Sequence, residues 1–237
     1  MTLQRLKFYL LHSFFPHRCC ACGRIFDEAR LFCSDCIKEI RPLKGDLCKV
    51  CLNDRALCTC KKHPKWYRQS TAPFVYDGAI RGALLRFKRY GDDAFGTFAA
   101  QHMAQAMEKS FQSLSFDVII PVPMHRSKRR KVGFNHSELL AQKLSEITGV
   151  PVDTKTLTQC KKAKPQHNLA FSERKENING IYRAKPLPEP LTVLLVDDII
   201  TTGFTLSECA KQLRFSGAKA VYTVGVAKNS GRKQPKE

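Results

Sequence analysis

VLLVDDIITTGFT, residues 193–205, is the stretch that decides the fold of this chain. Its leading apolar residues predict a buried parallel strand that ends at Asp197 and Asp198. Open α/β sheets bind ligands at the carboxyl ends of their strands. The turn from Thr201 to Thr205 can direct backbone N–H groups at an anion, and Gly203 permits close approach of a phosphate. Two carboxylates beside such a turn suit a ribose 5-phosphate. The alternative is an ordinary strand that ends in a capping Asp before a turn, and a single Asp would favour that alternative.

Strand and helix patterns alternate along the rest of the chain. The predicted strands cover residues 71–76, 116–123, 192–196 and 221–226, and the predicted helices cover 79–90, 94–111, 134–148 and 205–215. This alternation indicates a parallel sheet with right-handed crossovers. We therefore expect an α/β fold with helices on both faces of the sheet in residues 70–230. A small cysteine-rich domain precedes it in residues 1–65, and residues 61–69 look like a linker.

Nine of the eleven cysteines lie between residues 19 and 60, in two groups. Two C-x2-C knuckles separated by ten residues predict one tetrahedral zinc site with the ligands Cys19, Cys22, Cys33 and Cys36. Cys20 is an alternative partner for Cys22. A second zinc is a further expectation, with the ligands Cys48, Cys51, Cys58 and Cys60. The last pair of that group is C-x-C instead of C-x2-C, which makes the second zinc the weaker expectation. His63 lies close by in the sequence and is an alternative ligand to one cysteine of that pair.

Zinc should stabilise this segment strongly, because few apolar residues lie between the cysteines and metal binding supplies on the order of 10 kcal/mol of folding free energy. All-thiolate sites keep no position open for water, so we expect structural zinc. Disulfides are the alternative, which a cytoplasmic location would disfavour. The two isolated cysteines, Cys160 and Cys209, are expected to be buried or inert thiols.

A net charge of +19 and a pI near 9.6 favour a polyanionic partner such as nucleic acid, an anionic membrane or a polyphosphate. The basic run after the predicted strand 116–123 is expected to be a loop in which Arg126 and Arg130 hold a pyrophosphate, although a merely solvated basic loop is the alternative. The candidate nucleic-acid contacts are Lys88, Arg89, Lys128, Arg129 and Lys131. Aromatic residues beside basic ones, at 66–68 and 87–90, are candidates for base stacking, with Phe87 favoured as a core residue.

No stretch of the sequence is long enough to span a bilayer, and residues 1–16 predict an amphipathic docking helix, with the inner face of the membrane as a candidate contact, rather than a signal peptide. We expect a cytoplasmic protein. A polar, basic stretch is expected to form a mobile flap over a ligand, with the residues Gln166, Asn168, Phe171, Arg174, Asn177 and Gly180.

The stretch 193–205 resembles the PRPP-binding motif of type I phosphoribosyltransferases. In that family the paired acids hold the ribose 2- and 3-hydroxyls and the Thr/Gly loop holds the 5-phosphate. The resemblance assigns the first role to Asp197 and Asp198. It assigns the second role to Thr201, Thr202, Gly203 and Thr205, with Phe204 contributing only a backbone amide.

The order of motifs along the chain is similar to that of the ComF family of competence proteins, of the ComFC/GntX type. The shared order is the cysteine knuckles, FKRYGD at 87–92, PVP at 121–123, Arg126 and Arg130, GFN at 133–135, the stretch 166–174, and the two aspartates. This resemblance covers nearly all residues after Pro16. It implies an N-terminal zinc finger joined to a phosphoribosyltransferase-type domain that binds PRPP with Mg²⁺.

The resemblance also implies a role. Competence members help incoming single-stranded DNA to enter the cytosol during natural transformation, with a DNA-translocating helicase as partner. The alternatives are an active phosphoribosyltransferase on an unknown acceptor, unrelated to DNA, and a zinc adaptor whose nucleotide-type site is degenerate. The sequence assigns no catalytic residue and no oligomeric state.

Overall fold

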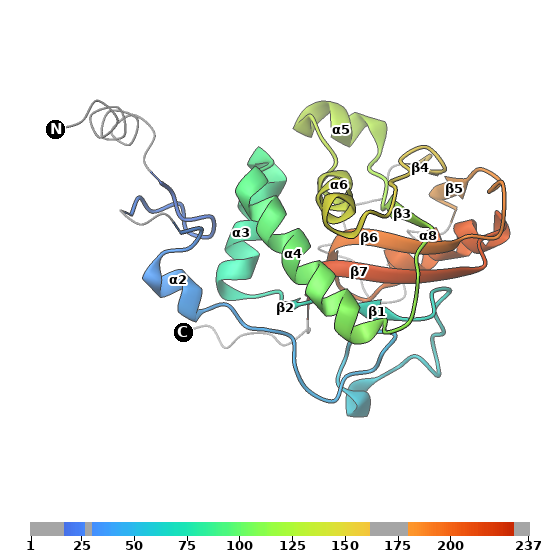
Figure 1. The fold of residues 1–237 in the computed structure, drawn as a ribbon, viewed down its shortest axis with the longest axis horizontal. Helices are drawn as coiled ribbons and strands as arrows, with labels where there is room; N and C mark the ends of the chain where they lie inside the picture. Colours follow the sequence, from blue (N-terminus) through green and yellow to red (C-terminus); the bar gives the residue numbers. More distant parts are fainter. Residues whose placement is uncertain (1–16, 27–29, 162–179, 230–237) are drawn as a thin grey trace.

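The computed structural model describes residues 17–26, 30–161 and 180–229, and its centre is a parallel five-stranded sheet (Figure 1). The strand order is β1-β7-β6-β3, and β2 extends the same edge as β1 by also pairing with β7. The strands are β1 (Ser70–Thr71), β2 (Phe74–Val75), β3 (Val118–Pro121), β6 (Thr192–Ile200) and β7 (Ala220–Lys228). Every pairing among them is parallel.

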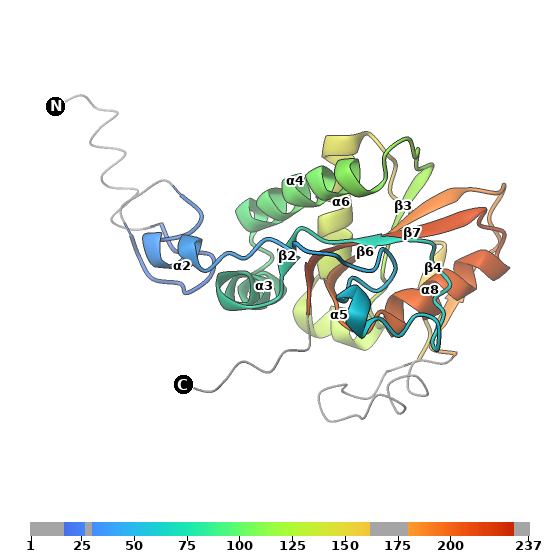
Figure 2. The same cartoon turned by 90° about the horizontal axis from the view of Figure 1, so that it is seen from below.

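Helices cover both faces of the sheet, as the sequence predicted (Figure 2). Leu194 and Val196 of β6 share a core with the helices α3 (Gly78–Tyr90), α4 (Asp93–Ser110) and α6 (His136–Thr148). Val193 and Leu195 point to the other face, because side chains alternate along a strand, and pack with α8 (Phe204–Phe215). The strands β4 (Leu157–Gln159) and β5 (Tyr182–Ala184) form an antiparallel pair beside α8.

Three elements differ from the sequence-based expectation. The predicted strand 71–76 is split into β1 and β2, because Pro73 has no backbone N–H for a ladder bond. The motif strand does not end at Val196 but continues through both aspartates to Ile200. The basic stretch after β3 is not a loop but the helix α5 (Arg126–Val132), which begins at the His125 cap and ends at Gly133, whose φ is 92°.

In the described part of the cysteine-bearing segment the only helices are short ones, α2 (Ser34–Lys38) and the 3-10 turn η1 (Arg55–Leu57). Its first part joins the core of α3 and α4 through Phe32 and its cysteines, and its second part contributes Leu52 and Tyr67 to the core of α8. The expected linker is attached to the sheet and to α8: the Arg68 N–H donates to the Val221 carbonyl at 2.8 Å, and the Trp66 N–H donates to Ser207 Oγ at 3.1 Å.

Among the described residues, no helix is long and apolar enough to cross a membrane. The predicted amphipathic helix of residues 1–16 lies outside the described residues, and so does the predicted flap except for Gly180.

Candidate functional site

The two aspartates lie near the carboxyl end of β6 and contact different helices. Asp198 points toward α3, where its Oδ2 lies 2.8 Å from Lys88 Nζ. The Asp197 Oδ1 accepts hydrogen bonds from Ser137 Oγ at 3.1 Å and from the Asp198 N–H at 2.9 Å. Each acid is therefore held by a different helix, Asp198 by α3 and Asp197 by the first turn of α6.

A small hollow, open to solvent, lies where β6 turns into α8. The lining residues are Asp197, Ile199, Ile200, Thr201, Gly203, Thr205 and Leu206. Gly203 has a left-handed backbone, with φ of 71°, and caps the start of α8. The hollow therefore brings one predicted acid together with the predicted turn at a helix N-terminus, where backbone N–H groups lack intrahelical partners. Three residues of the 193–205 motif that were predicted for the site are not among its lining: Asp198, Thr202 and Phe204.

The two neighbouring carboxylates of this site repel each other, and Lys88 forms an ion pair with one of them. Burial and the neighbouring charge of Asp198 raise the pKa of Asp197 to about 7. Burial works against the charge of Lys88, but the adjacent Asp198 carboxylate raises the pKa of this lysine. Burial lowers the pKa of His136, which precedes Ser137, to about 4 and keeps its ring neutral. Two ionised aspartates at this strand end therefore need a cation, and Lys88 supplies one positive charge.

The basic helix α5 approaches the same edge of the sheet as the aspartates. It follows β3, the parallel neighbour of β6, and the Val122 N–H donates to the Val196 carbonyl at 2.8 Å. The GFN stretch that ends this connection is fastened by Asn135, whose Nδ2 donates to the Val122 carbonyl at 3.0 Å and whose side chain caps α6. Arg126 and Arg130 are exposed on α5, and neither lines the hollow.

The five candidate nucleic-acid contacts differ in their surroundings. Lys88 is paired with Asp198, and Arg129 is paired with Glu138 at 3.0 Å. Arg89 is exposed beside Tyr90, with its guanidinium carbon 5.4 Å from the ring centroid. Lys128 and Lys131 are exposed on α5. Of the aromatic candidates for stacking, Phe87 and Tyr67 are buried, as preferred for Phe87, and Trp66 is 46% exposed and packs edge-on against Phe215.

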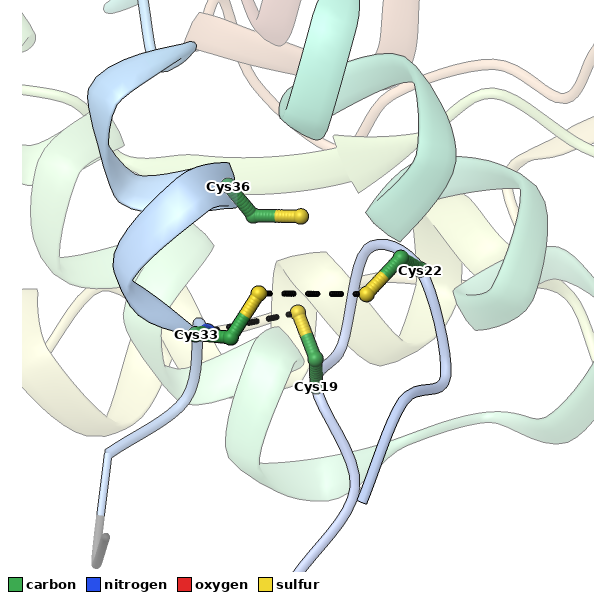
Figure 3. Close-up of side chains that lie close together, drawn as sticks. All are labelled: Cys19, Cys22, Cys33 and Cys36. Carbon is green, nitrogen blue, oxygen red and sulfur yellow. Dashed lines mark hydrogen bonds between the residues drawn. The ribbon is translucent and has the colours of Figure 1, made fainter. Parts of the chain in front are cut away.

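The first four-cysteine group converges as the knuckle spacing predicted (Figure 3). Cys19, Cys22, Cys33 and Cys36 have sulfur atoms within 4.8 Å of one another, and those of Cys22 and Cys33 lie 3.9 Å apart. Tetrahedral zinc with bonds of 2.3 Å separates its sulfurs by about 3.8 Å. Burial opposes ionisation of Cys19, but the backbone N–H groups of Cys22 and Cys33 lower its pKa to about 6. The geometry and donor set fit a closed zinc site.

The second group is equally compact despite its C-x-C pair. It consists of Cys48, Cys51, Cys58 and Cys60, again within 4.8 Å of one another. The sulfur atoms are 3.7 Å apart for Cys51 and Cys58 and 4.0 Å apart for Cys48 and Cys60. The Cys60 N–H donates to the Cys58 sulfur at 3.4 Å, so the shorter spacing directs a backbone donor at a ligand. His63 is not part of the group.

The remaining cysteines are not zinc ligands in these groups. Cys20 is buried, and its sulfur donates to Asp92 Oδ2 at 3.6 Å. Burial and that carboxylate raise its pKa to about 12. Its sulfur is not among the four that converge with Cys22, which argues against the alternative pair of Cys20 with Cys22. Cys209 is buried and Cys160 is exposed, so of the expected alternatives, a buried or an inert thiol, only the inert thiol remains for Cys160.

Sequence reasoning missed the residues that reach this site from distant parts of the chain. Ser137 binds Asp197, and Tyr67 places its hydroxyl behind Gly203, where a Cβ atom would lie 2.4 Å from it. Lys228 Nζ donates to the Thr201 carbonyl at 2.5 Å. None of these lies in a recognisable motif, since each contact joins segments separated by many residues. Lys88 lies within the quoted FKRYGD motif, but the sequence offered no sign that its partner is Asp198.

Two family models match the chain. Residues 10–66 match a double zinc ribbon domain, and residues 98–237 match a phosphoribosyl transferase domain. The double zinc ribbon match agrees with the two four-cysteine groups. Both findings favour two zinc sites over the expectation of one site with an uncertain second.

Curated relatives cover most of the chain. It is 33% identical to the DNA utilization protein YhgH of Escherichia coli O157:H7 over 86% of each chain. It is 26% identical to competence protein F of Haemophilus influenzae, over 91% of this chain and 99% of the relative. It is 24% identical to competence protein ComFC of Bacillus subtilis, over 79% of this chain and 80% of the relative. Together with the strand-end aspartates and the paired cysteine groups, these matches show that the chain belongs to the ComF family, built from a double zinc ribbon and a phosphoribosyl transferase domain.

Proposed function

We propose that this protein binds PRPP with Mg²⁺ at the end of β6 and takes part in the handling of incoming single-stranded DNA. One observation carries the ligand: the hollow combines Asp197 with the Thr201–Thr205 turn at the N-terminus of α8. Helix N-termini bind phosphate, and carboxylates bind sugar hydroxyls and magnesium. The predicted roles of Thr202, Phe204, Arg126 and Arg130 belong to this proposal, with the two arginines at the pyrophosphate.

Mg²⁺ suits the acids of this site. Carboxylate oxygens are its preferred protein ligands, and its charge would favour the ionised form of Asp197, whose pKa is raised by burial and by Asp198. Asp197 and Asp198 would hold the ion with the ribose hydroxyls, and the ion would neutralise the pyrophosphate. Lys88 forms an ion pair with Asp198 in this structure, and it would have to release that carboxylate for the ion to bind there.

The DNA role rests on charge and on the relatives. The net charge of +19 suits a polyanion, and the relatives are named for DNA utilization and competence. Exposed cations on α5 and at the end of α3 supply phosphate contacts. We place the protein in the cytoplasm, with a DNA-translocating helicase as partner, and divide it into a zinc-binding unit at 1–65 and a transferase-type unit at 70–230.

Calorimetric titration with PRPP and Mg²⁺ tests the ligand. We expect saturable binding by the native chain and a loss of affinity of about 100-fold or more for Asp197→Asn with Asp198→Asn, because two charge-assisted contacts disappear. Asp35→Asn with Asp46→Asn is the control for the lost charge, since both acids are exposed and paired with surface arginines. Equal affinity of the site variant and the control would remove the proposed site.

Salt-dependent binding of a labelled single-stranded oligonucleotide tests the DNA role. Each phosphate contact contributes about 0.7 to the slope of log affinity against log salt. Lys128→Ala with Lys131→Ala should therefore lower the slope by about 1.4. Arg24→Ala with Arg55→Ala removes the same net charge from the zinc ribbons and should change it less. Equal slopes for both variants would refute these DNA contacts.

Phosphoribosyl transfer to an unknown acceptor is the second candidate function, favoured by the match of residues 98–237 to a phosphoribosyl transferase domain. It predicts release of pyrophosphate from PRPP that the double aspartate variant abolishes. Saturable PRPP binding without pyrophosphate release, with bases, amines and nucleic acid each supplied as acceptor, would count against transfer and leave PRPP as a regulator.

A further inference from the structure

We propose that the second cysteine group, Cys48, Cys51, Cys58 and Cys60, supports the anion-binding turn at 201–204, with Tyr67 as the positioning residue between them. The ligand part of this inference rests on the proposed function, because the turn matters only if it holds a phosphate. The support itself follows from contacts between the zinc ribbon and the back of the turn.

Tyr67 is the central contact. Its side chain is 3% exposed, and its hydroxyl occupies the space next to Gly203, 2.4 Å from where a Cβ atom would stand. Gly203 holds the left-handed backbone that starts α8. The Tyr67 hydroxyl has no hydrogen-bond partner among the described residues. Tyr67 therefore acts through shape: its ring fills the space behind the turn and limits how far the turn can retreat from the hollow.

Two neighbours of Tyr67 hold the residues that follow Gly203. The Trp66 N–H donates to Ser207 Oγ at 3.1 Å, in the first turns of α8. Lys65 Nζ lies 4.0 Å from the centroid of the Phe204 ring. Lys65 and Trp66 thus both contact the first turn of α8.

The same segment is fastened to the second cysteine group. The Ser70 N–H donates to the carbonyl of Lys49, which lies between Cys48 and Cys51. Leu52, which directly follows Cys51, is 7% exposed and belongs to the same core as Tyr67 and Phe204. A ribbon with so little regular structure depends on its metal to fold. Loss of the metal at this group should therefore allow Tyr67, which packs behind the turn, to move.

The first cysteine group provides an internal contrast. It packs on the opposite face of the sheet, where the Ala21 carbonyl lies 2.8 Å from where a Cβ of Gly82 would stand on α3. Loss of its metal should therefore loosen α3 before it loosens the turn at 201–204.

Hydrogen exchange of the full-length protein, read by mass spectrometry together with a zinc count, tests this support. Cys58→Ser should remove one zinc and make amides in 199–207 exchange about tenfold faster or more. Cys22→Ser is the matched variant, because it removes one exposed thiolate from the first group. It should speed exchange in α3 and leave 199–207 within about twofold of the native rate. Unchanged exchange at 199–207 in Cys58→Ser, or equal acceleration in both variants, would overturn the inference.

A second pair of variants decides the matter if Cys58→Ser unfolds the whole chain. Tyr67→Phe keeps the ring and removes only an unpartnered hydroxyl, so exchange at 199–207 should stay near the native rate. Tyr67→Ala removes the ring and should speed that exchange and weaken binding of ribose 5-phosphate about tenfold. Equal exchange in the two variants would refute the positioning role. Absence of ribose 5-phosphate binding by the native chain would refute the proposed function alone, because the exchange comparison needs no ligand.

Discussion

Replacing Asp197 with Asn should stabilise the unliganded protein, and the gain should depend on pH. The pKa of Asp197 is raised to about 7 by burial and by Asp198, against 3.8 for an ordinary aspartate. Between these values the folded state holds more protons than the unfolded state, so the free energy of unfolding falls as pH rises. The difference corresponds to at most about 4 kcal/mol above pH 7. Because Asp197 lines an open hollow, water screens part of it, and we expect about 2 kcal/mol.

Denaturant unfolding of the native chain and Asp197→Asn, compared from about pH 5 to pH 8.5, measures this difference. Asn resembles the protonated carboxyl, so the two chains should differ least at the acid end and most above about pH 7, with the variant more stable. His136 and the cysteine thiolates are common to both chains and cancel in the difference. A difference that does not change with pH, or a variant that is the less stable chain above pH 7, would show that folded Asp197 is already ionised and would refute the reasoning.

The ion pair, the ribbon contact and the metals give three further predictions. Lys88→Met should lower the free energy of unfolding by about 2 to 3 kcal/mol at pH 7, because it leaves the nearly buried Asp198 without its ion-pair partner. Adding Asp198→Asn should recover most of that loss. Additive effects of the two substitutions, measured by denaturant unfolding in a double-mutant cycle, would contradict this. Gly82→Ala should lower the free energy of unfolding by about 1 to 3 kcal/mol, because its Cβ would lie 2.8 Å from the Ala21 carbonyl. Gly96→Ala should be neutral or stabilising by up to about 1 kcal/mol, because the atom nearest to its Cβ, on the Phe87 ring, would lie 3.4 Å away. Equal melting temperatures for these two variants would count against close packing of the first zinc ribbon on α3. Elemental analysis should find two zinc ions per chain, and a strong chelator should lower the melting temperature; a content of one zinc would refute the second site.

The sequence predicted those elements whose cause is local. The apolar run before Asp197, the glycines that end α3 and α6, and the C-x2-C knuckles each indicate their structure within a few residues. The helix α5 was missed because it buries no side chain, so a basic run without apolar spacing resembles a solvated loop. The β4–β5 pair was missed because each strand has only three residues and the partners are far apart in the chain.

The candidate site was predicted in part for the same reason. Asp197 and the turn at 201–205 are contiguous, and the structure brings them around one hollow. Lys88, Ser137 and Tyr67 reach the site from α3, α6 and the ribbon, and a single sequence carries no signal for such long-range contacts. The pKa of Asp197 depends on these neighbours and on burial, so it could not be anticipated from the motif.

The cysteine-bearing segment contributes side chains to both hydrophobic cores: Phe32 meets Phe95 with 6.5 Å between ring centroids on one face, and Tyr67 lies in the core of Phe204 on the other. A shortened chain that begins at residue 70 would therefore uncover apolar surface on both faces at once. Such a fragment should aggregate rather than behave as an independent transferase, so activity must be assayed on the full-length protein with its zinc retained.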